Sequence, residues 1–136
     1  RRGLMRLAFF VAVLLLAGPS AFAADDDCDR DNQGQMAMNQ CAAVDAAKAD
    51  AELNKVYKQL AAKADGKEKI ALRDAQRAWI AFRDKECEYQ TIGEDGGSIR
   101  PMELAMCAQE MTEARTKALA HDLACASGDK SCDKKE

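Results

Sequence analysis

Residues 75–87 read AQRAWIAFRDKEC and hold the only tryptophan of the chain, Trp79, together with Phe82, two arginines and a cysteine. Trp79 and Phe82 are three positions apart, so a helix places them on one face. The same helical face also carries Leu72, Ala75 and Glu86. Aromatic residues at this spacing fill a protein core more often than they line a ligand site. We therefore predict that Trp79 and Phe82 supply the bulk of a helical core, and that Trp79→Ala costs about 3–5 kcal/mol.

Two further helical patterns flank this segment. Apolar residues recur at steps of three and four over 35–64 and again over 104–123. Gly66 suits the end of the first helix, and Pro101 suits the first position of the last one. No alternating strand pattern of useful length occurs. The sequence thus predicts an all-α fold, a disulfide-stapled bundle of three helices with a long first helix, as one domain over 35–125.

The first 23 residues have the features of a secretory signal peptide. Three arginines within the first six residues precede an apolar run at 7–17, and the small-residue motif AFA (21–23) follows it. The run is too short for a membrane-spanning helix, which needs roughly 20 residues. We predict a signal peptide at 1–23 with cleavage after Ala23, and hence a periplasmic or secreted protein. Met5 is a candidate start of translation.

The charge balance limits the class of partner. The chain has 20 Lys and Arg against 23 Asp and Glu, and residues 1–23 contain three of the arginines and no acid. The mature chain therefore carries a net charge of about −6, with an acidic N-terminal arm at 24–34 and a polar C-terminal tail at 126–136. Nucleic acid is excluded as a partner because phosphate binding needs a basic surface. A cationic protein partner is favoured instead.

The cysteines indicate a disulfide framework. All six lie beyond the predicted cleavage point, and an even count in an exported protein is typical of disulfides. No C-x-x-C pair occurs and there is one histidine, so we predict no metal site. Cys87 shortly precedes the break between the second and third helices, and Cys107 lies two turns into the third, so the two can face each other. The last two cysteines are expected to pair because they are close in sequence, and the first two are paired by elimination. The expected pairs are Cys28–Cys41, Cys87–Cys107 and Cys125–Cys132.

Polar side chains on the predicted helices have two interpretations. For the adjacent Arg83 and Asp84, Arg83 either binds a ligand carboxylate with its planar fork or takes part in ion pairing inside the bundle. Asp50 is then an available acidic partner and Arg115 an available basic one. We favour the ion pair, because charges beside a small core usually need a partner. Asp50 and Asn54, four positions apart, either form a polar notch or meet polar groups of the other helices. The residues expected to have this structural polar role are Asp50, Asn54, Arg83, Asp84 and Arg115.

The glycine-rich loop at 93–98 is the candidate partner-binding segment. Its carboxylates, Glu94 and Asp95, lie between glycines that let the backbone approach a partner closely, although the loop also serves as a plain helix connection. The residues concerned are Gly93, Glu94, Asp95, Gly96, Gly97 and Ser98. His121 has no nucleophile near it in sequence and is expected on the surface near a helix end. No phosphate loop, cofactor motif or pair of catalytic carboxylates occurs, so we interpret the chain as a binding protein without a cofactor and not as an enzyme.

Five segments resemble the lysozyme inhibitor LprI-like domain family, in order and at natural spacing within residues 28–125. They are QMAMNQCA (35–42), ADAELNKVYKQL (49–60), AQRAWIAFRDKEC (75–87), GGSIRPMELAMC (96–107) and MTEARTKAL (111–119). The end of the chain, LACASGDKSC (123–132), is similar to that of secreted members.

The resemblance implies a small secreted or periplasmic helical protein that binds a lysozyme, a cationic cell-wall hydrolase, and inhibits it. The alternative is an envelope structural or stress-related interaction module with no lysozyme activity. The family takes its name from a lipoprotein, but PSAFAADDDC (19–28) is not a lipobox, because Cys28 follows an acidic run. No lipid anchor is expected for this chain.

Overall fold

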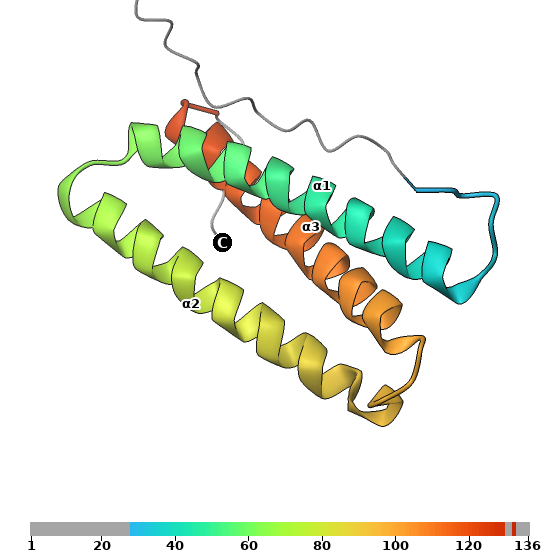
Figure 1. The fold of residues 1–136 in the computed structure, drawn as a ribbon. Helices are drawn as coiled ribbons and strands as arrows, with labels where there is room; N and C mark the ends of the chain where they lie inside the picture. Colours follow the sequence, from blue (N-terminus) through green and yellow to red (C-terminus); the bar gives the residue numbers. More distant parts are fainter. Residues whose placement is uncertain (1–27, 130–131, 133–136) are drawn as a thin grey trace, which may run out of the picture.

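The computed structural model describes residues 28–129 and 132 (Figure 1). Three long helices follow one another, α1 (Gln35–Lys63), α2 (Gly66–Gln90) and α3 (Arg100–Ala126), with a short 3-10 helix, η1 (Ile92–Glu94), after α2. No strand occurs within this part of the chain. The predicted all-α bundle of three helices with a long first helix is therefore confirmed.

Several predictions from the sequence fall on positions outside this range. They are the signal peptide at 1–23, the first residues of the acidic arm (24–27), and positions 130, 131 and 133–136 of the polar tail. Within 28–129 and at 132, no helix combines the length and apolar character needed to cross a membrane.

Helices α1 and α3 lie side by side and run in the same direction, while α2 runs opposite to both and diverges from them (Figure 1). Most of the contact between helices is made by α1 and α3, and α2 contacts α3 more than it contacts α1. At the start of both parallel helices, the Asn39 side-chain amide donates a hydrogen bond to the Ser98 carbonyl at 3.0 Å. The core consequently belongs mainly to the first and third helices.

The core is a small cluster of aliphatic side chains. Three come from α1 at helical spacing, and one comes from α3: Leu53, Val56, Leu60 and Leu119. Four partly buried residues pack against them, namely Tyr57, Leu72, Trp79 and Leu123. Since each fully buried aliphatic side chain contributes only about 1.5–3 kcal/mol, a core of this size gives the disulfides a large share in stability.

The face that α2 turns toward the other helices differs from the one predicted. The buried and partly buried line of α2 contains Leu72, Gln76, Trp79, Arg83 and Cys87. Phe82 is 56% exposed, so the prediction that it fills the core is wrong. The physical reason is helical rotation, because Phe82 lies about 100° around the helix from Arg83. Trp79 is partly buried and packs against the core cluster.

Two helix boundaries also differ from those predicted. Gly66 was expected to end the first helix, but α1 ends at Lys63 and Gly66 is the first residue of α2. Its φ of +43°, which favours glycine, makes the sharp reversal between the two helices possible. The third helix begins at Arg100, one residue before Pro101. Proline is tolerated there because N–H groups of the first turn have no partner within the helix.

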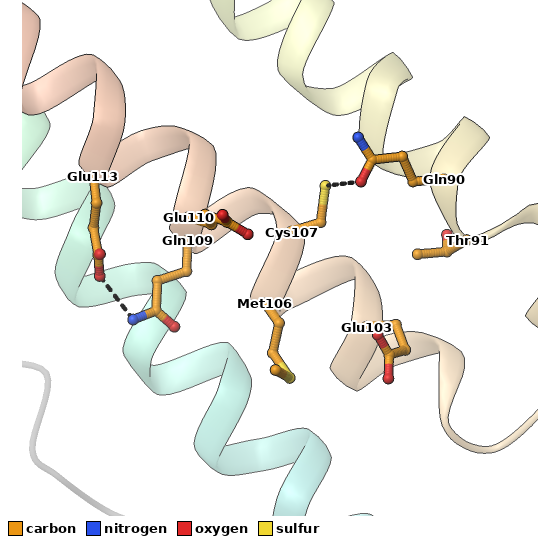
Figure 2. A pocket seen from close by; sticks show the side chains of 8 residues that line it. All are labelled: Gln90, Thr91, Glu103, Met106, Cys107, Gln109, Glu110 and Glu113. Atoms are coloured by element: carbon orange, nitrogen blue, oxygen red, sulfur yellow. Dashed lines mark hydrogen bonds between the residues drawn. The ribbon is translucent and has the colours of Figure 1, made fainter.

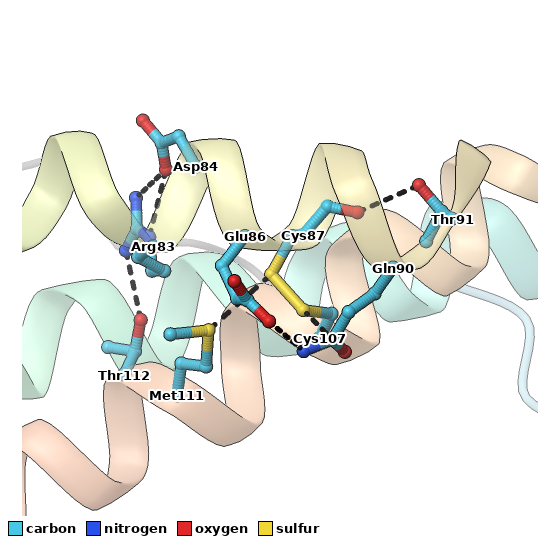
Figure 3. The surroundings of a disulfide bond; sticks show 9 residues. All are labelled: Arg83, Asp84, Glu86, Cys87, Gln90, Thr91, Cys107, Met111 and Thr112. Carbon is cyan, nitrogen blue, oxygen red and sulfur yellow. Dashed lines mark hydrogen bonds and ion pairs between the residues drawn. A yellow bond between two sulfur atoms is a disulfide. The ribbon is translucent and has the colours of Figure 1, made fainter.

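Three disulfides join the described part of the chain in the expected pairs. Their Cα atoms are 5.1 Å apart for Cys28–Cys41, 5.7 Å for Cys87–Cys107 and 5.4 Å for Cys125–Cys132. All three separations lie in the usual range for a disulfide. Cys87–Cys107 joins the end of α2 to the early part of α3 (Figure 3). It therefore holds the diverging helix at the end opposite to the α1–α2 turn (Figure 1).

Candidate functional site

Arg83 of α2 connects all three helices through its guanidinium group. Its Nη1 donates to Asp50 Oδ1 of α1 at 2.6 Å and to Thr112 Oγ1 of α3 at 2.9 Å. Its Nε donates to the neighbouring Asp84 at 2.9 Å, as Figure 3 shows. The side chain is only 11% exposed. Arg83 is thus engaged by the fold, and of the partners suggested by the sequence it is Asp50 that it contacts.

This environment keeps Arg83 charged. Burial lowers the pKa of Arg83, but the hydrogen bonds and charges of Asp84 and Asp50 outweigh burial, so the pKa is raised above its usual value. A group whose pKa is raised by folding contributes stability that is lost only when the pH rises through the folded-state pKa. The contribution of Arg83 therefore persists throughout the neutral and moderately alkaline range.

A second arginine completes an arrangement around the tryptophan. Arg115 Nε donates to Gln76 Oε1 at 3.2 Å. The guanidinium carbons of Arg83 and Arg115 lie 5.5 and 5.8 Å from the centre of the Trp79 ring. Contacts of this length are attractive because the ring face is electron-rich. Trp79 thus serves the interface between α2 and α3.

Asn54 and His121 are both exposed. Within the described residues, the Asn54 side chain makes no hydrogen bond to α2 or α3, so it is not brought into the Arg83 network. His121 lies in the last turns of α3, where its Nε2 is 3.6 Å from Cys125 Sγ. His121, Cys125 and Cys132 have ligand atoms within 4.8 Å of one another. The two sulfur atoms are bonded to each other, and neither is a thiolate that a metal ion could use.

The loop at 93–98 is exposed along its whole length. The Gly97 amide donates to the Glu94 carbonyl at 2.8 Å, and Gly96 has a φ of +76°, so the glycines form a tight turn. Asp95 forms an ion pair with Arg100 at the start of α3. Within the described residues, the Glu94 side chain has no such pair. The two carboxylates therefore differ, and Glu94 is the one whose charge is not offset by an adjacent arginine.

A hollow of about 380 Å³ lies beside this loop, between the end of α2 and the outer face of α3. Figure 2 shows most of its side chains projecting from α3, with Gln90 and Thr91 at the end of α2. Three glutamates and a half-exposed methionine dominate the α3 side: Glu103, Met106, Glu110 and Glu113. Cys107, joined to Cys87, also lines it. The hollow is consequently acidic and braced by a disulfide.

The hollow was not predicted from the sequence, and neither was the burial of two polar residues, Gln76 and Thr112. The spacing of Glu103, Met106 and Glu110 along α3 was the available signal, because residues three, four and seven apart share a helix face. For Gln76 and Thr112 no signal was available, since their burial depends on how the helices pack.

The chain matches the family model described as lysozyme inhibitor LprI over residues 27–119. An uncharacterised protein of Rhizobium meliloti strain 1021 is 38% identical over 131 residues, and the alignment covers 85% of this chain and 94% of the relative. No solved structure matches the chain. Because the match to the family model spans most of the chain, with α1, α2, the loop at 93–98 and most of α3, the chain belongs to the lysozyme inhibitor LprI family.

Proposed function

We propose that the protein is an exported inhibitor that binds a lysozyme or a similar cationic cell-wall hydrolase. Membership of the lysozyme inhibitor LprI family is the observation that carries the proposal. Three disulfides are consistent with a location outside the cytoplasm. In the proposal, a signal peptide at 1–23 directs the chain to the periplasm or the medium, and the mature protein acts by binding and not by catalysis.

The loop at 93–98 is proposed to contribute to the contact. It is exposed, and it presents Glu94 and Asp95 on a protein with a mature net charge of about −6. Opposite charges at the edge of an interface mainly accelerate association. Since Asp95 is paired with Arg100, we assign the larger part of the loop's effect to Glu94.

The test is inhibition of lysozyme on isolated cell walls by the purified mature protein at low and physiological salt. The variant Glu94→Gln/Asp95→Asn is compared with the control Asp65→Asn/Glu68→Gln. The control loses the same charge at the α1–α2 turn, at the other end of α2 (Figure 1). We expect the wild type and the control to inhibit, with the loop variant weaker and slower to associate.

Two outcomes separate the parts of the proposal. If the wild type gives no inhibition at micromolar concentration, the inhibitor function is wrong and the envelope interaction module takes its place. If the wild type inhibits and the loop variant matches the control, the inhibitor function stands and the assignment of the loop is wrong.

A further inference from the structure

We propose that the hollow between the end of α2 and the outer face of α3 receives a lysine or arginine side chain from the basic surface of the inhibited hydrolase. This inference rests on the proposed inhibitor function and names the surface that anchors the partner. The anchor is separate from the loop at 93–98, although the two adjoin, since Thr91 and Glu103 flank the loop in sequence and both line the hollow.

Several side chains on the α3 side of the hollow are open to solvent in the described part of the chain. Glu110, Met106 and Glu113 are all exposed, and Met106 has half of its surface open to solvent. Glu113 accepts a hydrogen bond from Gln109 at 2.8 Å. No hydrogen bond or ion pair engages the carboxylates of Glu103 and Glu110 within 28–129 and 132. Two carboxylates are thus left for a partner.

The arrangement fits a long cationic side chain. Glu103 and Glu110 are seven residues apart, which places them about 10 Å apart along the helix axis. Met106 lies between them in sequence, on the same outer face. Lysine and arginine pack an aliphatic stem on apolar surface while their charged group meets a carboxylate. An acidic hollow with a methionine wall offers both contacts, whereas a purely apolar or anionic occupant leaves the glutamates unpaired.

The walls of the hollow are held in position before a partner arrives. Cys107 is bonded to Cys87, and its sulfur is also in contact with Gln90 Oε1 at 3.6 Å. Gln90 in turn donates to Glu86 at 2.9 Å, one turn earlier in α2 (Figure 3). Because the disulfide already fixes the end of α2 beside α3, the two helices do not have to be brought together when a partner binds.

The experiment compares Glu103→Gln/Glu110→Gln with the control Asp65→Asn/Glu68→Gln. The control removes the same number of negative charges at a place far from the hollow. Hen-type lysozyme is the cationic probe, and both inhibition of lysis and association kinetics on immobilised lysozyme are measured. We expect the hollow variant to need about tenfold more protein for half inhibition at low salt, with a smaller difference at physiological salt. Met106→Lys, which places a cation in the hollow, should reduce inhibition further. Circular dichroism melts show whether each variant is folded.

The outcomes are distinct. Weaker inhibition by both hollow variants, with intact melts and an active control, supports the inference. Equal inhibition by the wild type, the control and both hollow variants overturns the hollow as an anchor and leaves the inhibitor function standing. Equal weakening of control and hollow variants also overturns it, because net charge alone then explains the effect. A wild type that neither binds nor inhibits lysozyme refutes the proposed function and the inference together.

Discussion

Replacing Arg83 with methionine tests whether one guanidinium group holds α2 against the other two helices. Methionine keeps most of the aliphatic length of arginine and loses the charge and every N–H donor. The side chain of Arg83 is 11% exposed and contacts Asp50, Thr112 and Asp84. The substitution therefore removes polar contacts while leaving much of the packing.

The expected loss in the free energy of unfolding depends on how exposed each partner of Arg83 is. Thr112 is 1% exposed, and depriving its buried hydroxyl of a donor costs about 1–3 kcal/mol. Asp50 is 48% exposed, so solvent screening limits its ion pair to about 1 kcal/mol or less. The contact of Arg83 with the Trp79 ring adds about 0.5–1 kcal/mol. These contributions add to a total loss of about 1.5–5 kcal/mol, which for a domain of this size lowers the melting temperature by roughly 8–25 °C.

Thermal and urea unfolding report this loss, and fluorescence of the single tryptophan gives a local signal, because Trp79 lies against Arg83. Arg77→Met is the matched control, since Arg77 is exposed on the same helix. It should change the free energy of unfolding by about 0.5 kcal/mol or less. If the two variants are equally stable, the connection of the three helices through Arg83 does not stabilise the fold and the reasoning fails.

Two further predictions concern the disulfides and the face of α2. Cys87→Ser/Cys107→Ser removes a link between residues 20 positions apart and should lower the free energy of unfolding, measured in urea, by about 3 kcal/mol. Unchanged stability, or a Cys41–Cys87 link in unreduced peptide maps, would contradict the pairing. Phe82→Ser should change stability by about 0.5 kcal/mol or less because Phe82 is exposed. Trp79→Ala should cost about 3 kcal/mol, the lower end of the range expected from the sequence, because Trp79 is only partly buried. A large loss at Phe82 in thermal melts would show that α2 packs with another face.

The periodicity of apolar residues was sufficient to predict the helices but not how they pack together. Apolar residues at steps of three and four positions predicted a first helix that starts at Gln35, and the observed α1 starts there and has 29 residues. The same rule placed Leu72 and Trp79 on the packed face of α2 correctly but wrongly added Phe82, because it counts apolar residues and disregards Gln76 and Arg83. Those two residues are buried or nearly so through partners on other helices, Arg115 and Asp50.

For the candidate site too, the sequence predicted the local features, and the packing of the helices determined the rest. The sequence identified Glu94 and Asp95 as loop carboxylates, but the ion pair of Asp95 with Arg100 depends on the turn that the glycines form. The acidic hollow requires the end of α2 to lie beside α3, so residues distant in sequence create it together. A helix read alone shows which side chains share a face, and only the packed structure shows what lies opposite.

The parallel pairing of α1 with α3 has a consequence for how the chain folds. Leu53 and Leu119 pack in one cluster although about half the chain separates them. The main interface therefore cannot form between neighbouring helices as each is completed. Its formation must wait for α2 to reverse the chain and for α3 to return alongside α1. Folding rates fall as contacts become less local, so this bundle should fold more slowly than three helices of equal length packed in sequence order. The Cys87–Cys107 bond shortens the effective loop between α1 and α3, because it bypasses the residues between the two cysteines.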